Sequence, residues 1–164
     1  MILRALAIAL ISLVLVACGF QLRGEARLPA VMDRTWLQSS DDSSTFVREL
    51  ARYLEANGVA LIDKPDEQAA TLQIFSERMR REPLTITGEA RVREFLLIFD
   101  VNFELRDGEG QVLIERERLQ LTREFSFDEQ EILAAQREQE FLEGDLRRAM
   151  TARLVRRLEA AGDS

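Results

Sequence analysis

The 164-residue chain contains no histidine and only one cysteine. Without histidine, the chain cannot form a Ser–His–Asp triad, a Cys–His dyad or a histidine-ligated zinc site. A single cysteine excludes an internal disulfide, a thiolate zinc cluster and an iron–sulfur cluster. Basic residues are outnumbered, 22 Lys and Arg against 29 Asp and Glu. This acidic balance argues against general nucleic-acid binding, which depends on neutralising phosphates.

Recognisable catalytic motifs are also missing. Acidic pairs such as Asp41–Asp42 and Asp128–Glu129 have no candidate nucleophile and no Gly-rich phosphate loop near them in the sequence. With 46% hydrophobic and 31% charged residues, the composition is that of an ordinary folded domain. We therefore expect one domain that is not an enzyme and uses no cofactor.

The first 18 residues carry a targeting signal. Arg4 precedes the apolar stretch 5–16, which is too short to span a bilayer because that takes about 20 apolar residues. Leu15-Val16-Ala17-Cys18 follows and resembles a bacterial lipobox. We predict cleavage before Cys18, a diacylglyceryl group on its sulfur and an acyl group on the new amino terminus, since one acyl chain alone binds only reversibly. The alternative is a plain signal peptide with a chance cysteine near its end.

Gly19 follows the predicted acylation site. In bacterial lipoproteins an Asp at this position favours retention in the inner membrane, so Gly19 is compatible with transfer to the outer membrane. We predict three segments: a signal peptide at 1–17, a lipid-anchored lead at 18–30 and a single periplasmic α+β domain at 31–164.

Hydrophobic periodicity divides the domain into helices and strands. A short strand is predicted at 35–38, followed by a helix at about 45–56 that Asn57-Gly58 ends. Residues 59–62 continue in extended form. A long helix is predicted from about 128 to 160, where Leu and Met recur every four residues.

Three longer strands are predicted between these helices, at 71–81, 93–106 and 111–127. The odd positions of the second, from Phe95 to Leu105, are all apolar, which predicts one buried face. In the third, the apolar positions change parity, and this predicts a bulge near Arg116.

The order β-α-β-β-β-α predicts an α+β fold, a two-layer sandwich. Its mostly antiparallel four-stranded sheet carries both helices on one face. The strands at 35–38 and 71–81 are joined through a helix and can therefore pair in parallel.

Several arginines are predicted to gather at one end of this sheet. With hairpins centred near residue 86 and between residues 108 and 109, Arg81 falls opposite Arg91, and Arg93 falls opposite Arg123–Glu124. Guanidinium forks pair with phosphate, and the apolar strand faces beside them suit acyl chains. The candidate binding residues for an anionic ligand are Arg81, Arg91, Arg93 and Arg123.

An alternative interpretation of these arginines is structural. Glutamates lie in the same segments, among them Glu77, Glu82 and Glu124. Solvated cross-strand Arg–Glu pairs are common and contribute little to stability. The Arg147-Arg148 and Arg156-Arg157 pairs are similarly expected on the solvated face of the last helix.

The run Cys18-Gly19-Phe20-Gln21-Leu22-Arg23-Gly24 resembles the start of mature LptE-type lipoproteins, which take part in lipopolysaccharide assembly in the Gram-negative outer membrane. Residues 57–63 are similar to that family's helix end and the segment after it. The size, the element order and the strand around Val101-Asn102-Phe103 are compatible with the family.

This resemblance implies a non-enzymatic role. Such a protein sits in the outer membrane on the periplasmic side and forms a complex with the β-barrel LptD. There it acts as a plug and assembly partner and binds lipopolysaccharide for insertion into the outer leaflet. A sheet-and-helix wedge suits a wide barrel, whose lumen is polar. The alternative is another outer-membrane lipoprotein acting as an envelope scaffold or solute-binding module.

The family's basic positions do not align cleanly with this sequence. The assignment of the four arginines as ligand-binding residues therefore rests on the strand-register argument alone.

Overall fold

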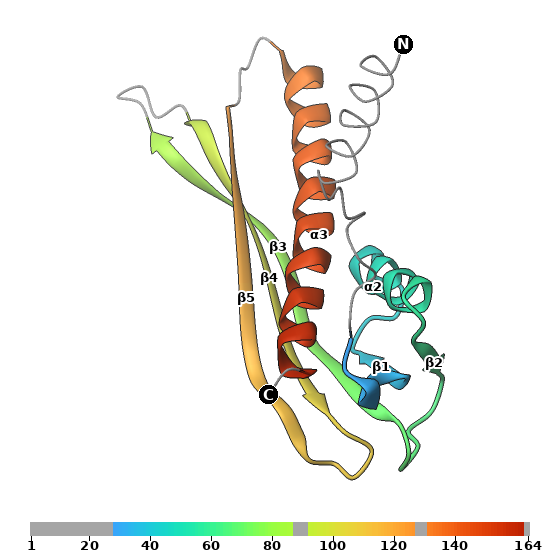
Figure 1. Cartoon of the computed structure of the whole chain (residues 1–164). Helices are drawn as coiled ribbons and strands as arrows, with labels where there is room; N and C mark the ends of the chain where they lie inside the picture. The colour runs from blue at the N-terminus through green and yellow to red at the C-terminus, as the bar shows by residue number, and fades with distance from the viewer. Residues whose placement is uncertain (1–27, 87–91, 127–130, 163–164) are drawn as a thin grey trace, which may run out of the picture.

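The computed structural model describes residues 28–86, 92–126 and 131–162. The fold is α+β, as predicted. Three long strands form a twisted sheet, α3 runs along one face of it, and α2 lies with the short strands β1 and β2 at one end (Figure 1). The elements are η1 (Ala30–Met32), β1 (Arg34–Ser39), α2 (Thr45–Ala56), β2 (Ala60–Ile62), β3 (Ala70–Ile86), β4 (Val92–Arg106), β5 (Val112–Ser126) and α3 (Ile132–Gly162).

The sheet has five strands in the order β2-β1-β3-β4-β5. β1 is parallel to both β2 and β3, whereas β3, β4 and β5 form an antiparallel meander. The predicted parallel pair and the predicted meander are both confirmed. The prediction of four strands is wrong, because Ala60–Ile62 pairs with β1 as a fifth strand. A strand of three residues is too short to show a period-two pattern.

α2 begins and ends where the sequence indicates. The Ser44 hydroxyl accepts a hydrogen bond from the Val47 N–H at 3.3 Å, which caps the first turn. Gly58 follows the helix with φ of 89°, a left-handed conformation that glycine adopts at least cost. α3 begins at Ile132 and ends at Gly162, so its observed bounds differ from the predicted 128–160. Residues 127–130, where the predicted start falls, lie outside the described residues.

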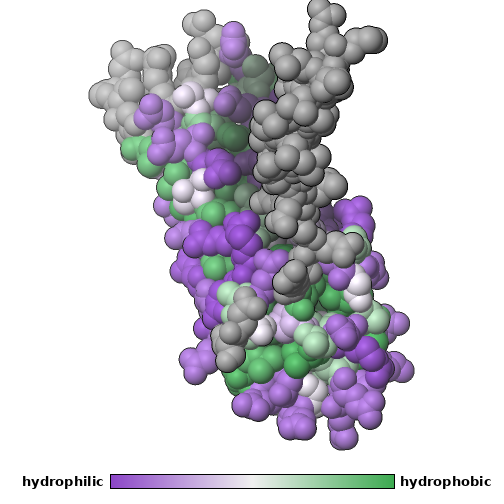
Figure 2. All heavy atoms as spheres, in the orientation of Figure 1, coloured by the Kyte–Doolittle hydropathy of each residue, from purple (hydrophilic) through white to green (hydrophobic). Residues whose placement is uncertain are grey.

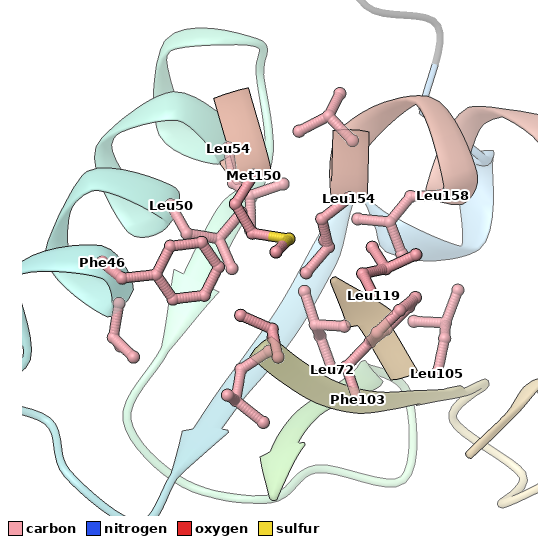
Figure 3. Packing of buried hydrophobic residues seen from close by; sticks show 14 of the residues in the cluster. Phe46, Leu50, Leu54, Leu72, Phe103, Leu105, Leu119, Met150, Leu154 and Leu158 are labelled. Atoms are coloured by element: carbon pink, nitrogen blue, oxygen red, sulfur yellow. The ribbon is translucent and has the colours of Figure 1, made fainter. Parts of the chain in front are cut away.

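The core lies between the sheet and both helices. Figure 3 shows α2 and α3 contributing residues that meet the side chains of one sheet face. The Phe46 ring on α2 makes an edge contact with Phe99 on β4, with 5.4 Å between ring centroids. Each fully buried side chain of this size contributes about 1.5–3 kcal/mol. The labelled core residues are Phe46, Leu50, Leu54, Leu72, Phe103, Leu105, Leu119, Met150, Leu154 and Leu158.

Most of this core lies at one end of the molecule, and Leu97 and Phe125 extend it toward the other end. The buried side chains of the C-terminal half of α3 run from Leu146 to Leu158. In the described N-terminal half of α3, the buried residue is the small Ala135. We call the end that holds β1, β2, α2 and the C-terminal half of α3 the proximal end. The distal end holds the first half of α3, the end of β3 from Arg80, the start of β4 up to Ile98, and the end of β5 from Thr122.

The predicted bulge near Arg116 is confirmed. Phe103 pairs with Glu117, but Leu105 pairs with Ile114, so β5 carries one residue more than β4 over this interval. The bulge changes which residues of β5 face α3 and returns Leu119 and Leu121 to the side of the core.

Candidate functional site

Two of the four predicted arginines flank one buried residue. Arg81 on β3 and Arg123 on β5 both pair with Leu97 on β4, which is 1% exposed. Directly opposed residues of neighbouring strands point to the same face. The two guanidinium groups therefore belong to one row of the sheet, on the face that carries α3.

The predicted pairings of these arginines are wrong. Arg81 lies opposite Leu97 rather than Arg91, because Ile86 pairs with Val92 and the first turn is centred about three residues later than expected. Glu94 pairs with Ser126, three residues beyond Arg123, so Arg93 is not opposite Arg123–Glu124. The later turn accounts for the changed partner of Arg81. For Arg93, most of the offset comes from two register shifts in β5 between Val112 and Glu117.

Arg81 and Arg123 both reach α3. An N–H of the Arg81 guanidinium donates to Gln139 Oε1 at 3.1 Å, and its central carbon lies 4.4 Å from the centroid of the Phe95 ring. Arg123 donates from Nε and Nη2 to Asp145 Oδ2, at 3.0 and 2.8 Å. Arg81 thus donates to a neutral partner on α3, whereas Arg123 pairs with a carboxylate.

A hollow of about 490 Å³ opens beside Arg81, which we call the distal hollow. Its walls are Arg81 and the first turns of α3, including Gln139 and the half-exposed Ile132. Phe95, which contacts the Arg81 guanidinium, stacks on Phe125 at 5.5 Å. The hollow itself combines the Arg81 cation and the apolar side chains of Ile132 and Ala135 with one carboxylate, from Glu140. The aromatic pair lies beside Arg81, outside the lining of the hollow.

A smaller hollow of about 160 Å³ beside β5 has the opposite character. Its walls include three carboxylates, from Glu94, Glu124 and Glu138. With one arginine and one carboxylate in its walls, the distal hollow is therefore less unfavourable for an anionic ligand than this smaller hollow with its three carboxylates. Among the residues that the structure describes, no group of three or more His, Cys, Asp or Glu side chains is placed to hold a metal ion.

The remaining predicted site residues are Arg91, Arg93 and Cys18. Arg93 belongs to the start of β4, between the pairs formed by Val92 and Glu94. Arg91 and Cys18 lie outside the described residues. The roles assigned to them from the sequence remain predictions.

Two acidic residues that the sequence argument missed organise the arginines. Asp145 is the partner of Arg123, and only the packing of α3 on β5 brings them together. On the opposite sheet face, Asp100 accepts from Nε and Nη2 of Arg118 at 3.0 and 2.7 Å and also pairs with Arg80. The Asp100 side chain is only 6% exposed although α3 lies on the other face. The apolar residues Leu96 and Ile98, at alternate positions before Asp100, were the sequence signal that this face is partly covered.

Comparisons with known proteins agree with this fold. The family model LptE, described as "Lipopolysaccharide-assembly", matches residues 29–158. The LPS-assembly lipoprotein LptE of Photorhabdus laumondii is 27% identical over 153 residues, which cover 93% of this chain and 83% of that protein. The protein of the same name from Yersinia enterocolitica is 27% identical over 159 residues, covering 93% and 73%.

A solved structure shows the same architecture. The solution structure of lipoprotein B from Nitrosomonas europaea has a TM-score of 0.75 at 26% identity and covers 89% of this chain and 94% of that one. Throughout the described part of the chain, no helix combines the length and apolarity that crossing a membrane requires.

Proposed function

Because this chain belongs to the LptE family of lipopolysaccharide-assembly lipoproteins, we propose that it acts in the outer membrane as the partner of an LptD-type β-barrel. It plugs the barrel, assists barrel assembly and binds lipopolysaccharide for insertion into the outer leaflet. Family members are envelope lipoproteins and not enzymes, which confirms the expectation of a non-enzymatic protein. The observation that carries the proposal is the family match over 29–158.

The surface of the molecule supports a role inside a barrel. Charged and polar side chains are spread over the visible face, with apolar residues between them (Figure 2). The sheet face opposite α3 is polar as well, with the Asp100 cluster and a hydrogen bond of 2.8 Å from Asn102 to Ser76. A polar lumen suits such a surface better than lipid would.

The distal hollow is the proposed lipopolysaccharide site. Lipopolysaccharide carries phosphates and acyl chains, so it needs cations next to apolar surface. Within the hollow, Arg81 supplies a cation and Ile132 supplies apolar contact. Arg123, in the same row of the sheet, and Phe95, which contacts the Arg81 guanidinium, are proposed to extend the site beyond the hollow. Arg91 and Arg93 are close in sequence to the turn between β3 and β4 and are proposed to add to the positive charge there.

The proposed anchor is a lipidated Cys18, with a diacylglyceryl group on sulfur and an acyl group on nitrogen. It would hold the protein to the inner leaflet of the outer membrane, on the periplasmic side. Several acyl chains give a lasting attachment, because each buried CH₂ contributes about 0.8 kcal/mol.

Co-purification tests the partnership. The acylated protein is pulled down from detergent-solubilised outer membranes, and we expect a large β-barrel protein in equal amount. A pull-down without any barrel would contradict the proposal and favour a separate envelope scaffold or a solute-binding module.

Charge reversal tests the ligand site. Arg81→Glu with Arg123→Glu, and separately Arg91→Glu with Arg93→Glu, should weaken lipopolysaccharide binding about tenfold or more without loss of secondary structure. The matched control reverses Arg52 and Lys64, exposed cations far from the distal hollow. Equal binding by all variants would remove these arginines from the site.

A further inference from the structure

A second basic groove lies at the proximal end, between the edge strand β5 and the C-terminal half of α3, which run side by side (Figure 1). Its volume is about 480 Å³. Leu119, Leu121 and Ala149 contribute apolar surface to it, and Arg153, Arg156 and Arg157 line it from α3. We call it the proximal groove. It shares no residue with the distal hollow, which the first turns of α3 line.

The three arginines are not equally engaged. Arg157 Nε donates to Glu117 Oε2 at 2.8 Å, so the carboxylate in the groove neutralises one of them. Arg153 Nη1 donates a hydrogen bond of 3.3 Å to the backbone oxygen of Gln120. Arg156 is exposed and forms no hydrogen bond or ion pair with any residue that the structure describes. Two positive charges thus remain over apolar surface, in a chain whose net charge is −7.

The groove is close to the point where the anchor segment enters the domain. Pro29 lies against Gly162, since a Cβ added to that glycine would be 3.0 Å from Pro29 Cγ. Gly162 is two residues beyond Ala160, which lines the groove. Residues 18–28 span ten peptide units, which reach about 35 Å at most when fully extended. Cys18 therefore remains within reach of this end, whereas the 31 residues of α3 extend about 45 Å away from it.

We propose that the proximal groove binds an anionic phospholipid of the membrane in which the protein is anchored. The lipid phosphate lies between Arg153 and Arg156, whose guanidinium groups donate paired hydrogen bonds to its oxygens. The first methylene groups of an acyl chain lie along Leu119 and Leu121. This inference rests on the proposed acylation of Cys18 but is independent of lipopolysaccharide binding in the distal hollow.

Position and charge favour a phospholipid over other anions. A free phosphate ion makes no use of the apolar surface. Lipopolysaccharide also has suitable chemistry, but its proposed site is the distal hollow at the other end of α3. A bound phospholipid gives the domain a second attachment besides its anchor segment, and so fixes the direction in which α3 points from the membrane.

The test uses the acylated full-length protein in nonionic detergent. Phosphatidylglycerol is titrated in, and bound lipid is counted by native mass spectrometry, with phosphatidylcholine of the same acyl chains as the zwitterionic comparison. The test variant is Arg153→Gln with Arg156→Gln, which leaves the Arg157–Glu117 pair intact. The matched control is Arg52→Gln with Arg137→Gln, which removes the same charge from exposed helix positions outside the groove.

We expect the wild type and the control to prefer phosphatidylglycerol, and the test variant to bind it about tenfold more weakly. Equal phosphatidylglycerol binding by test variant and control overturns the proposal. So does equal competition by water-soluble glycerophosphoglycerol, because the apolar surface then has no part. Displacement of the phospholipid by lipopolysaccharide from wild type, but not from the test variant, would assign the groove to lipopolysaccharide instead. Retained capture of the barrel by the test variant separates this inference from the proposed function.

Discussion

Arg123 and Asp145 join the edge strand of the sheet to α3 through two hydrogen bonds to a single carboxylate oxygen, at 3.0 and 2.8 Å. The pair is partly exposed, with side chains 39% and 37% accessible. It holds Arg123 beside Leu97, in the same row as Arg81. If Arg123 binds a phosphate as proposed, Asp145 competes with that phosphate for the guanidinium group.

Asp145→Asn should strengthen lipopolysaccharide binding while slightly lowering stability. The change removes the carboxylate that competes for Arg123, and we expect about a threefold gain in affinity. The loss of an exposed ion pair should cost less than about 1 kcal/mol. Titration with labelled lipopolysaccharide and urea unfolding measure the two effects. Weaker binding with unchanged secondary structure would show that Asp145 positions Arg123 for the ligand instead of competing with the ligand.

Asp100→Asn should destabilise the fold. The substitution leaves Arg80 and Arg118 beside each other without the carboxylate that both contact, at a position 6% exposed. Losing a fully buried partner costs about 3–5 kcal/mol, and the partial exposure of both arginines reduces this to about 2 kcal/mol. Urea unfolding measures the free energy of unfolding of this variant. The control is Asp42→Asn, which makes the same substitution at an exposed loop position. Equal unfolding midpoints for the two variants would contradict this role.

Gly108→Ala should cost more stability than Gly58→Ala. A Cβ at Gly108 would lie 2.4 Å from the backbone oxygen of Glu67, so the loop after β2 must shift. Gly58 has φ of 89°, but a Cβ added there would meet nothing within 4 Å, so its substitution carries only the backbone cost of about 1 kcal/mol. We expect about 2–3 kcal/mol at Gly108. Thermal or urea unfolding of both variants tests the order, and a reversed order would contradict it.

The contribution of Asp66 to stability should depend on pH. The Gln68 N–H and the Arg34 guanidinium, 2.9 and 2.8 Å from its carboxylate, hold the pKa of Asp66 below its ordinary value of 3.8. Because the folded-state pKa is depressed, the stabilisation is complete above the unfolded-state pKa and disappears as the pH falls through the folded-state value. Asp66→Asn should therefore lower the unfolding midpoint at pH 7, and the difference from wild type should shrink at about pH 3. A difference that stays constant between these pH values would exclude the mechanism.

Cys18→Ser should block lipoprotein processing. Without the thiol there is no diacylglyceryl acceptor, so the precursor should keep residues 1–17 and incorporate no labelled fatty acid. Mass spectrometry of the protein from membranes measures both. Normal cleavage of this variant would identify the first 17 residues as a plain signal peptide.

Local patterns in the sequence were enough to predict most of the secondary structure. The alternation from Phe95 to Leu105 identified β4 and its buried face, and the change of parity around Arg116 identified the bulge. The row from Leu146 to Leu158 identified the buried side of α3. These features depend on the spacing of side chains along one strand or helix, so a single segment contains them.

Tertiary structure alone decided which arginines meet and which groups they contact. Two extra residues in β5 and a later turn after β3 moved the distal pairings, which placed Leu97 between Arg81 and Arg123. The partner of Arg123 comes from α3, and its position depends on how the helix packs across the sheet. Periodicity along the chain determines which face of a strand is buried, but strand register and helix packing depend on contacts between segments that are distant in sequence.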